Sequence, residues 1–327
     1  MAHIFLTGAT GFIGSFVARI LVESQHEVTC LVRENSNLSW IKELDLKLVT
    51  GTLQDPATFE SHLKDVEYII HLAGVTKSHD PELFYLGNVQ VTHKLLSCIT
   101  ERKISLKKFI FVSSQAAVGP SPSAEPVDEK HPCYPLTQYG KSKWQAEQVV
   151  QNFQSHIPVT IVRPTAVYGP RDTDVYNFFK LMTYGINLMV GKVDQLVNVV
   201  YVEDCANGII KAAFSEKTVG KTYFICEEEA YYWSQFAQIT ADILQKKYIT
   251  IKLPVPLVNM VALFLEKWAR FRGQDTILNR DKMQEVGEPF WRVTCIQARK
   301  DFNYQTQFPA PLGIEKTLGW YQENNWL

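Results

Sequence analysis

The sequence predicts an α/β fold in which helices cover both faces of a doubly wound parallel sheet. Short aliphatic or β-branched runs alternate with longer helical patterns over the first half of the chain, which is the rhythm of successive βαβ units. Each run is apolar along its length, as in a strand covered on both faces. The predicted strands are His3–Thr7, Val28–Val32, Leu46–Thr50, Tyr68–Leu72, Lys108–Ser113 and Val159–Arg163.

Two of the connecting helices are predicted from apolar residues that recur at helical spacing. The first runs from Phe12 to about Ser24, and the second from Leu83 to about Arg102. With a helix between each pair of strands, the strands are expected to pair in parallel.

The chain is expected to divide into a first domain and a smaller lobe. Residues 1–165 form the first domain, and residues 197–226 are expected to return to it. Residues 166–196 and 227–327 are richer in helices and aromatic residues. We expect them to form a smaller C-terminal lobe over the carboxyl ends of the strands, where a small-molecule substrate binds.

Composition excludes several classes of protein. The 327 residues are 46% hydrophobic, enough for a substantial core, and the formal net charge of −1 gives no broad basic field for nucleic acid or an anionic membrane. The six cysteines include no CxxC pair, which is typical of reduced thiols. We find no repeat, no apolar stretch of membrane-spanning length and no secretory leader, so a cytoplasmic protein is expected.

A glycine-rich turn follows the first predicted strand and opens the first helix. Its glycines permit a tight turn, close backbone approach to a pyrophosphate and close helix packing, while N–H groups at the helix start meet the phosphate charge. The spacing is GxxGxxG, and its position after the first strand favours a dinucleotide site over an ordinary turn. The residues expected to contact the cofactor are Gly8, Thr10, Gly11, Phe12, Ile13 and Gly14.

The end of the second strand bears on the choice between NADP and NAD. An acidic residue there would bind a ribose 2′-hydroxyl, whereas an arginine would pair with a 2′-phosphate. Arg33 stands at this point, and the first carboxylate, Glu34, comes after it. We therefore favour NADP, with NAD remaining possible and a solvated surface arginine as the alternative.

Three residues form a candidate catalytic group. Tyr139 and Lys143 stand one turn apart on a predicted helix, so a lysine ammonium can stabilise a tyrosine phenolate and lower its pKa. Ser114 follows the strand FIFVS at the sheet edge where ligands bind, and can donate a hydrogen bond to a substrate oxygen. No metal site is predicted.

Together with further motifs, these residues make the chain resemble the extended short-chain dehydrogenase/reductases, the NAD-dependent epimerase/dehydratase family. The resemblance implies a Rossmann fold with a C-terminal substrate lobe. It also implies that Tyr139 is a general acid/base, that Lys143 holds the nicotinamide ribose, and that Ser114 orients the substrate oxygen. The further motifs are His71-Leu72-Ala73-Gly74, Asn88-Val89, Arg163-Pro164-x-x-x-Tyr168-Gly169-Pro170 and YVEDCANGIIKAA.

Other roles are implied by the same resemblance. Leu53, Ala73 and Gly74 would contact the cofactor, Pro164 would lie against the nicotinamide, and Asn88 would support the architecture. The two helices expected near residues 83–102 and 139–153 would be the faces of a possible homodimer. Thr52 stands where many relatives have an aspartate at the adenine, so adenine recognition would rest on backbone groups.

The substrate is expected to be partly hydrophobic. Gln115-Ala116 replaces the acidic pair of the family's dehydratases, and Leu196-Val197-Asn198 lacks the arginine that grips a sugar diphosphate in its epimerases. The apolar helix expected at 256–271 and the stretch Asn279–Met283 resemble the 3β-hydroxysteroid dehydrogenase and dihydroflavonol reductase side of the family. These features predict hydride transfer between nicotinamide and a carbonyl or alcohol.

Two alternatives remain at this point. One is a nucleotide-sugar 4-epimerase with tightly bound NAD, which uses the same catalytic residues. The other is a dinucleotide-sensing protein that keeps the fold without the chemistry, although all three catalytic positions are filled.

Overall fold

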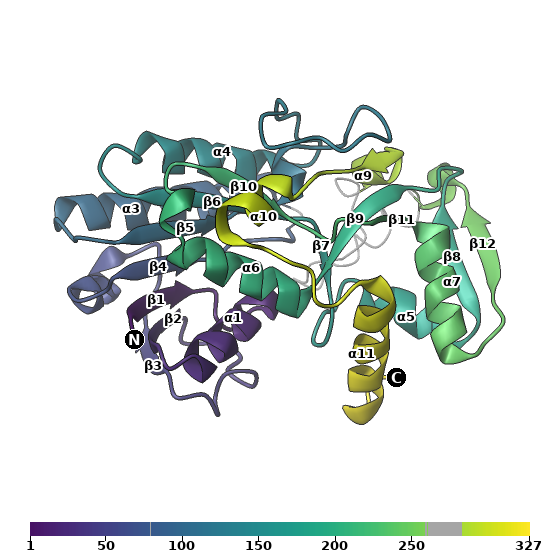
Figure 1. The fold of residues 1–327 in the computed structure, drawn as a ribbon, viewed down its shortest axis with the longest axis horizontal. Helices are drawn as coiled ribbons and strands as arrows, with labels where there is room; N and C mark the ends of the chain where they lie inside the picture. The colour runs from purple at the N-terminus through teal and green to yellow at the C-terminus, as the bar shows by residue number, and fades with distance from the viewer. Residues whose placement is uncertain (79, 259, 261–282) are drawn as a thin grey trace.

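The computed structural model describes residues 1–78, 80–258, 260 and 283–327, and the apolar helix and the stretch expected at 256–271 and 279–283 fall largely outside them. Seven parallel strands form the large sheet in the order β10-β6-β5-β4-β1-β2-β3 (Figure 1). The predicted doubly wound parallel sheet is therefore confirmed. The strands are β1 His3–Thr7, β2 Glu27–Val32, β3 Lys47–Thr50, β4 Tyr68–His71, β5 Lys108–Val112, β6 Val159–Pro164 and β10 Thr222–Ile225.

Helices cover both faces of this sheet because successive side chains of each strand point to opposite faces. In β1, Ile4 and Leu6 join the core beneath α1 (Phe12–Glu23) and α6 (Val202–Phe214). Phe5, between them, joins a second core beneath α3 (Val91–Glu101) and α4 (Gln138–Asn152). All three side chains are fully buried, which is why these strands are continuously apolar.

The helix predicted from Leu83 to about Arg102 is interrupted. The structure has a short helix α2 (Pro81–Phe84), then a π-helical turn at Tyr85–Gln90, and only then α3. A Cβ atom on Gly87 would lie 2.3 Å from the side chain of Val75, so this turn approaches the loop after β4 closely. Such contacts arise from tertiary packing, so the helical periodicity of the sequence does not predict the π-helical turn.

The smaller lobe contains two further sheets. One has the order β11-β9-β13, with β7 pairing β9, and the other is the pair β8–β12. Of the segment 197–226, β10 joins the large sheet and α6 packs on it, whereas β9 lies in the lobe. The lobe strands are β7 Ala166–Tyr168, β8 Ile186–Val190, β9 Leu196–Tyr201, β11 Ala230–Tyr232, β12 Ile249–Leu253 and β13 Phe290–Trp291.

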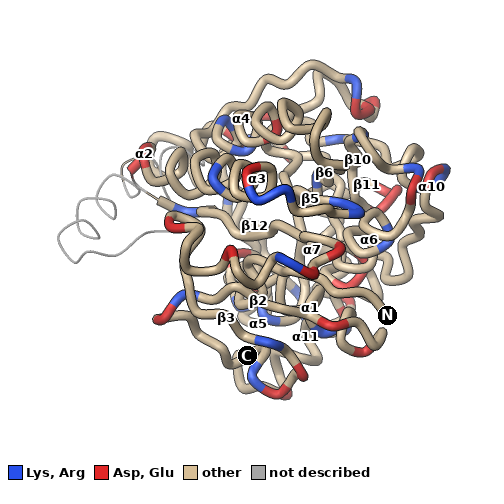
Figure 2. Tube along the Cα trace, turned by 90° about the vertical axis from the view of Figure 1, so that its left-hand side faces the viewer, with Lys and Arg blue, Asp and Glu red and all other residues tan. Residues whose placement is uncertain are grey.

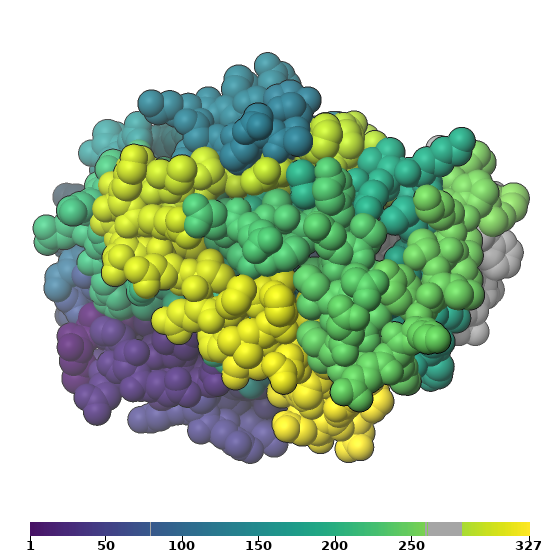
Figure 3. All heavy atoms as spheres, turned by 45° about the vertical axis from the view of Figure 1, so that its right-hand side comes forward, coloured from purple at the N-terminus to yellow at the C-terminus, as the bar shows by residue number. Residues whose placement is uncertain are grey.

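Helices from the C-terminal half close the junction between the domain and the lobe. Figure 3 shows the yellow C-terminal segments crossing between the purple domain and the green lobe. The aromatic side chains of Trp40 and Trp320, one from each side, lie 5.8 Å apart between ring centres. The other described helices of the C-terminal half, besides α6, are α5 Tyr176–Thr183, α7 Trp233–Leu244, α9 Met283–Val286, α10 Ile296–Phe302 and α11 Ala310–Glu323. Short 3-10 turns lie at 56–58, 60–63, 115–117 and 216–218.

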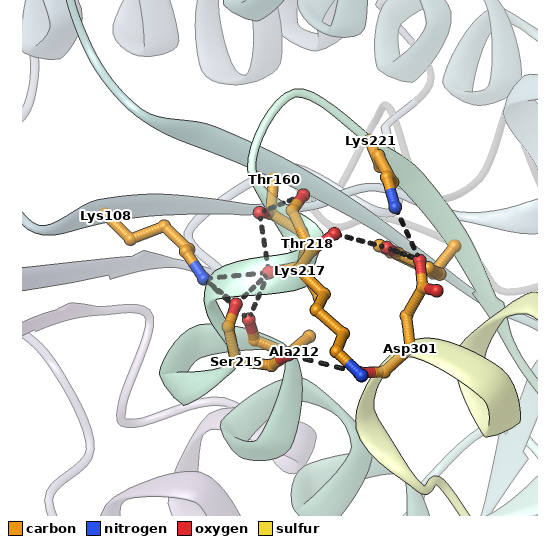
Figure 4. Close-up of polar contacts among 9 residues, drawn as sticks. Lys108, Thr160, Ala212, Ser215, Lys217, Thr218, Lys221 and Asp301 are labelled. Atoms are coloured by element: carbon orange, nitrogen blue, oxygen red, sulfur yellow. Dashed lines mark hydrogen bonds and ion pairs between the residues drawn. The ribbon is translucent and has the colours of Figure 1, made fainter.

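A buried lysine, Lys108, lies where the amino ends of the strands of the large sheet meet the end of α6 (Figure 4). Lys108 begins β5, and its ammonium donates to the Thr218 hydroxyl at 2.8 Å and to the carbonyl oxygens of Ala212 and Ser215. Those carbonyls end α6, where a cation is favoured by the helix dipole. Burial lowers the pKa of Lys108 to about 8. Because ligands bind at the opposite edge of such sheets, we assign this lysine a structural role.

Charges of both signs are interspersed along the chain. Figure 2 shows Lys and Arg alternating with Asp and Glu over the side of the molecule that carries α3 and α4. Among the described residues, no helix is both long and apolar enough to cross a bilayer.

Candidate functional site

The glycine turn makes close backbone contacts with α1 on one side and with the loop after β4 on the other. Gly8 has φ +81°, and a Cβ atom there would lie 2.7 Å from the backbone nitrogen of Ala73. A Cβ atom on Gly14 would lie only 2.0 Å from the carbonyl oxygen of Gly8. Gly11 is the N-cap of α1 and has no side chain to accept from the first N–H groups of the helix. These orphaned donors, in a cradle that side chains would fill, fit a dinucleotide pyrophosphate.

A buried histidine behind this turn is held by two threonines. The Thr92 hydroxyl donates to the carbonyl oxygen of Asn88 at 2.6 Å, so it accepts a hydrogen bond from the Nε2–H group of His71 at 3.0 Å. His71 Nδ1 is then the acceptor of the Thr7 hydroxyl at 2.7 Å. The same Thr7 oxygen accepts from the backbone N–H of Ala73 at 3.3 Å. One neutral tautomer of His71 therefore joins the glycine turn to the loop after β4.

A second network joins that loop to α4. The Asn88 side chain accepts from the backbone N–H of Val75 at 2.7 Å and donates to its carbonyl oxygen at 2.9 Å. Its amide also donates to the Ser142 hydroxyl at 2.8 Å, and Ser142 donates to the carbonyl oxygen of Tyr139 at 2.8 Å. A Cβ atom on Gly74 would lie 2.7 Å from the Asn88 amide oxygen, so only glycine leaves room for this contact.

The three expected catalytic residues lie at the carboxyl end of β5 and the start of α4. Thr137 caps α4 by accepting from a backbone N–H of its first turn. The Ser114 hydroxyl lies near that of Tyr139 and lowers its pKa. One turn further on, Lys143 is buried, with its ammonium donating to the carbonyl oxygen of Val112 at 2.7 Å. The structure thus places Ser114 and Tyr139 near each other, with Lys143 one helical turn further on against the end of β5.

Burial dominates the electrostatics of this group. It raises the pKa of Tyr139 to about 12, with smaller contributions from the Ser114 hydrogen bond, which lowers it, and from the carboxylates of Glu285 and Asp174, which raise it. Burial also lowers the pKa of Lys143 to about 8. We expected the lysine to lower the pKa of Tyr139. In this arrangement Lys143 is not among the groups that shift the pKa of Tyr139, and desolvation raises it, so the phenol keeps its proton at neutral pH.

The remaining expected cofactor contacts occupy different environments. Leu53 and Pro164 are buried, Ala73 is half-buried, and Arg33 is exposed. Pro164 ends β6, beside the strand that leads to Ser114. The Arg33 backbone N–H donates to the Ser36 hydroxyl at 3.0 Å. This bond curls the chain at the end of β2 and leaves the guanidinium at the surface.

Sequence reasoning missed the charged residues that surround Tyr139. Asp174, which pairs with Lys77, and Glu285, which accepts from the Thr137 hydroxyl at 3.2 Å, both act on the pKa of Tyr139. Glu285 lies far along the chain in α9, and no local pattern marks it. Asp174 follows the YGPR motif by three residues, which was the one available signal.

Arg171 was also missed. Its guanidinium lies 4.8 Å from the ring centres of both Phe16 and Trp40, and donates to the Ser15 hydroxyl at 3.0 Å. The segment after β7 is thereby held against the first turns of α1, next to the glycine turn. The described residues include no group of three or more His, Cys, Asp or Glu placed to hold a metal ion.

Comparison with known proteins decides the family. The model of the NAD-dependent epimerase/dehydratase family matches residues 4–226, which include the glycine turn and the Ser114, Tyr139 and Lys143 group. The chain belongs to this family. The predicted family and the prediction of an NAD(P)-dependent enzyme are both confirmed, and the family supports an NAD-dependent epimerase, dehydratase or reductase activity.

Curated relatives resemble the chain over almost its full length. Ceramide reductase of Caulobacter vibrioides is 26% identical over 98% of this chain and 95% of its own. N-acetyl-alpha-D-glucosaminyl-diphospho-ditrans,octacis-undecaprenol 4-epimerase of Escherichia coli O157:H7 is 28% identical over 97% and 94%. The vaccinia virus 3 beta-hydroxysteroid dehydrogenase/Delta 5-->4-isomerase is 23% identical over 99% and 100%.

Solved structures share the whole fold. The structure of gox2253 has a TM-score of 0.82 and 30% identity, covering 99% of both chains. UDP-glucuronic acid 4-epimerase from Bacillus cereus, in complex with NAD, has a TM-score of 0.79 and 20% identity, covering 98% of this chain and 99% of the other. Structural neighbours therefore bind NAD.

The buried histidine predicts a pH dependence of stability. Burial lowers the pKa of His71 from 6.5 to about 3, so below pH 6.5 the unfolded chain takes up a proton that the folded chain does not. The contribution of His71 to stability is then constant above about pH 6.5 and falls by about 1.4 kcal/mol per pH unit below it. In urea unfolding, the change in stability from pH 7 to pH 5 should be about 2 kcal/mol less favourable in the wild type than in the His71→Asn variant. The exposed His93→Asn variant should keep the wild-type loss, and an equal loss in His71→Asn would contradict the assignment.

Proposed function

We propose that the protein is an oxidoreductase that moves hydride between a nicotinamide and a carbonyl or alcohol carbon of a partly hydrophobic substrate. The observation that carries the proposal is the Ser114–Tyr139 hydroxyl pair at the end of β5, with the buried Lys143 ammonium one helical turn from Tyr139. Two adjacent hydroxyls converge where the strands end, so both can donate to one substrate oxygen.

Each member of the pair has a distinct part in the chemistry. The bound nicotinamide supplies or accepts the hydride. Tyr139, protonated at neutral pH because burial raises its pKa, gives its proton to the carbonyl oxygen as negative charge develops there. Ser114 holds the same oxygen by a hydrogen bond. Lys143, one helical turn from Tyr139, would hold a ribose hydroxyl of the bound cofactor with its ammonium.

Two neighbouring side chains argue against dehydration and against a sugar diphosphate. Gln115 is buried and carries an amide where an elimination would need a carboxyl acid. Asn198 is fully buried and committed to backbone groups. It donates to the carbonyl oxygens of Glu227 and Glu229 and accepts from the N–H of Val293. Asn198 is therefore unable to replace the arginine that would grip a diphosphate.

The names of relatives support a hydrophobic substrate. The Caulobacter relative is a ceramide reductase and the vaccinia relative is a hydroxysteroid dehydrogenase. Both names join a redox reaction to a lipid. We therefore propose a long-chain or polycyclic ketone or alcohol as the substrate class.

A 4-epimerase is the second candidate, because the Escherichia coli relative with 28% identity carries that name. Such an enzyme returns the hydride to its own substrate and keeps its cofactor. Protein purified with stoichiometric NAD, and unable to turn over added NADPH with ketones, would favour this candidate over the reductase.

For the proton donor, the test is Tyr139→Phe, with the exposed Tyr134→Phe as the matched control. We expect kcat for NADPH oxidation, measured with a panel of long-chain and polycyclic ketones, to fall at least about 100-fold in Tyr139→Phe. Tyr134→Phe should match the wild type, and NADPH binding should persist in both variants. A Tyr139→Phe variant that reduces ketones at the wild-type rate would contradict the proposal, as would a protein that binds NADPH and reduces none of the panel.

NADP is the proposed cofactor, since Arg33 leaves its guanidinium exposed at the end of β2. Arg33→Ser should weaken NADPH binding by about tenfold or more, because it removes a charge-assisted hydrogen bond to the 2′-phosphate. The affinity for NADH, which lacks this phosphate, should stay unchanged. Arg102→Ser, which removes a surface arginine paired with Glu60, is the control. Nicotinamide fluorescence titrations measure both affinities. Equal loss for NADPH and NADH, or no loss for either, would assign Arg33 to the surface.

A further inference from the structure

The two-stranded sheet β8–β12 turns its apolar face outward. In the parallel register, Ile249, Ile251 and Leu253 stand beside Ile186, Leu188 and Val190, all on one face. Leu188, Ile249 and Ile251 are exposed by 41%, 64% and 38%. This sheet lies at the end of the lobe farthest from β1 to β3 (Figure 1).

The opposite face of the same sheet is more polar, carrying Asn187, Thr250 and Lys252 beside Met189. Asn187 is buried there, and its amide donates to the Thr250 hydroxyl at 3.3 Å. A sheet with one solvated face ordinarily turns its polar side chains outward. Since a slip of one residue would exchange the faces, the outward aliphatic face is a specified feature of the fold. Exposed apolar surface continues in Val255 and Leu257, which follow β12.

The segments that carry this apolar face are rich in lysine, although Lys252 itself lies on the opposite face of the sheet. Residues 176–193 and 243–260 supply five lysines and no aspartate or glutamate, in a protein whose net charge is −1. The acidic residues just outside these segments are engaged: Asp194 accepts from the Ser234 backbone and Asp242 from the Gln238 amide. The lysines are Lys180, Lys192, Lys246, Lys247 and Lys252, all exposed.

We propose that the β8–β12 face binds the surface of an anionic lipid bilayer. The aliphatic side chains would enter the boundary between lipid head groups and acyl chains. The lysines next to the strand ends would meet lipid phosphates. A second copy of the chain fits poorly, because a symmetric dimer would set the same lysines against each other. Nucleic acid would pair with the lysines and leave the aliphatic face exposed to water. The overall charge balance gave no sign of this surface, since it is local to one small sheet.

Vesicle flotation tests the proposal directly. The full chain is mixed with vesicles of phosphatidylcholine alone, or of phosphatidylcholine with an equal part of phosphatidylglycerol. We expect flotation with the mixed vesicles only, weakening as salt is raised. Ile249→Ser/Ile251→Ser and Lys192→Ala/Lys247→Ala should each lower binding by about tenfold or more. All variants should keep the wild-type unfolding temperature within a few degrees and the wild-type NADPH affinity.

Matched controls remove equivalent groups elsewhere. Leu48→Ser/Ile296→Ser takes away two other exposed aliphatic side chains, and Lys42→Ala/Lys47→Ala two other exposed lysines. Both should float like the wild type. The proposal is overturned if the wild type does not float with mixed vesicles, or if the β8–β12 variants float as well as it does. It is also overturned if light scattering shows a dimer that Ile249→Ser/Ile251→Ser dissociates without changing flotation.

Discussion

The whole site depends on backbone contact at the glycine turn. Gly14 allows α1 to approach the carbonyl oxygen of Gly8, and Gly8 in turn allows the loop after β4 to approach the turn. Side chains at these positions would separate α1 from the sheet by more than packing tolerates. The contact directs unsatisfied N–H groups at the start of α1 toward the sheet edge. It also fixes where the neighbouring loops stand, and those loops support the catalytic helix.

From this contact, hydrogen bonds between neutral groups reach the proposed chemistry. His71 joins the turn to the loop after β4, and Asn88 joins that loop to Ser142 of α4. Because nearly every donor and acceptor in this chain of contacts is paired, the network stays rigid without burying charge. A separate ion pair holds α4 from its other side, where the fully buried Glu147 meets Arg163 of β6 at 2.6 Å. Lys143 and Tyr139 are thereby held in register with Ser114.

How much the sequence predicts depends on the range of the interaction. The strands and α1 follow from local apolar pattern and are predicted within a residue or two. The proposed catalytic group is picked out by short motifs. The π-helical turn at Tyr85–Gln90 arises from contact with Val75, which a helical period does not reveal. Placement of β9 in the lobe depends on pairing with β11 and β13, up to about ninety residues away. Glu285 reaches Tyr139 through the same long-range assembly.

The lobe carries what is particular to this chain. Proteins that share this fold can keep the same backbone geometry at the dinucleotide site while the lobe differs between them. One fold can therefore serve many substrates. In this lobe, the side chain of Asn198 forms hydrogen bonds with backbone groups, and aliphatic side chains of β8 and β12 are exposed to solvent. Both features accord with a protein that works on hydrophobic molecules near a lipid surface.

The most direct measurement is a titration of Gly14→Ala with NADPH and NADH by nicotinamide fluorescence, beside Gly319→Ala. A Cβ atom on Gly319 meets nothing within 4 Å, whereas on Gly14 it collides with the Gly8 carbonyl. The account predicts that the wild type and Gly319→Ala bind cofactor equally, and that folded Gly14→Ala binds at least about tenfold more weakly. Wild-type affinity in Gly14→Ala, or no binding by the wild type, would contradict it.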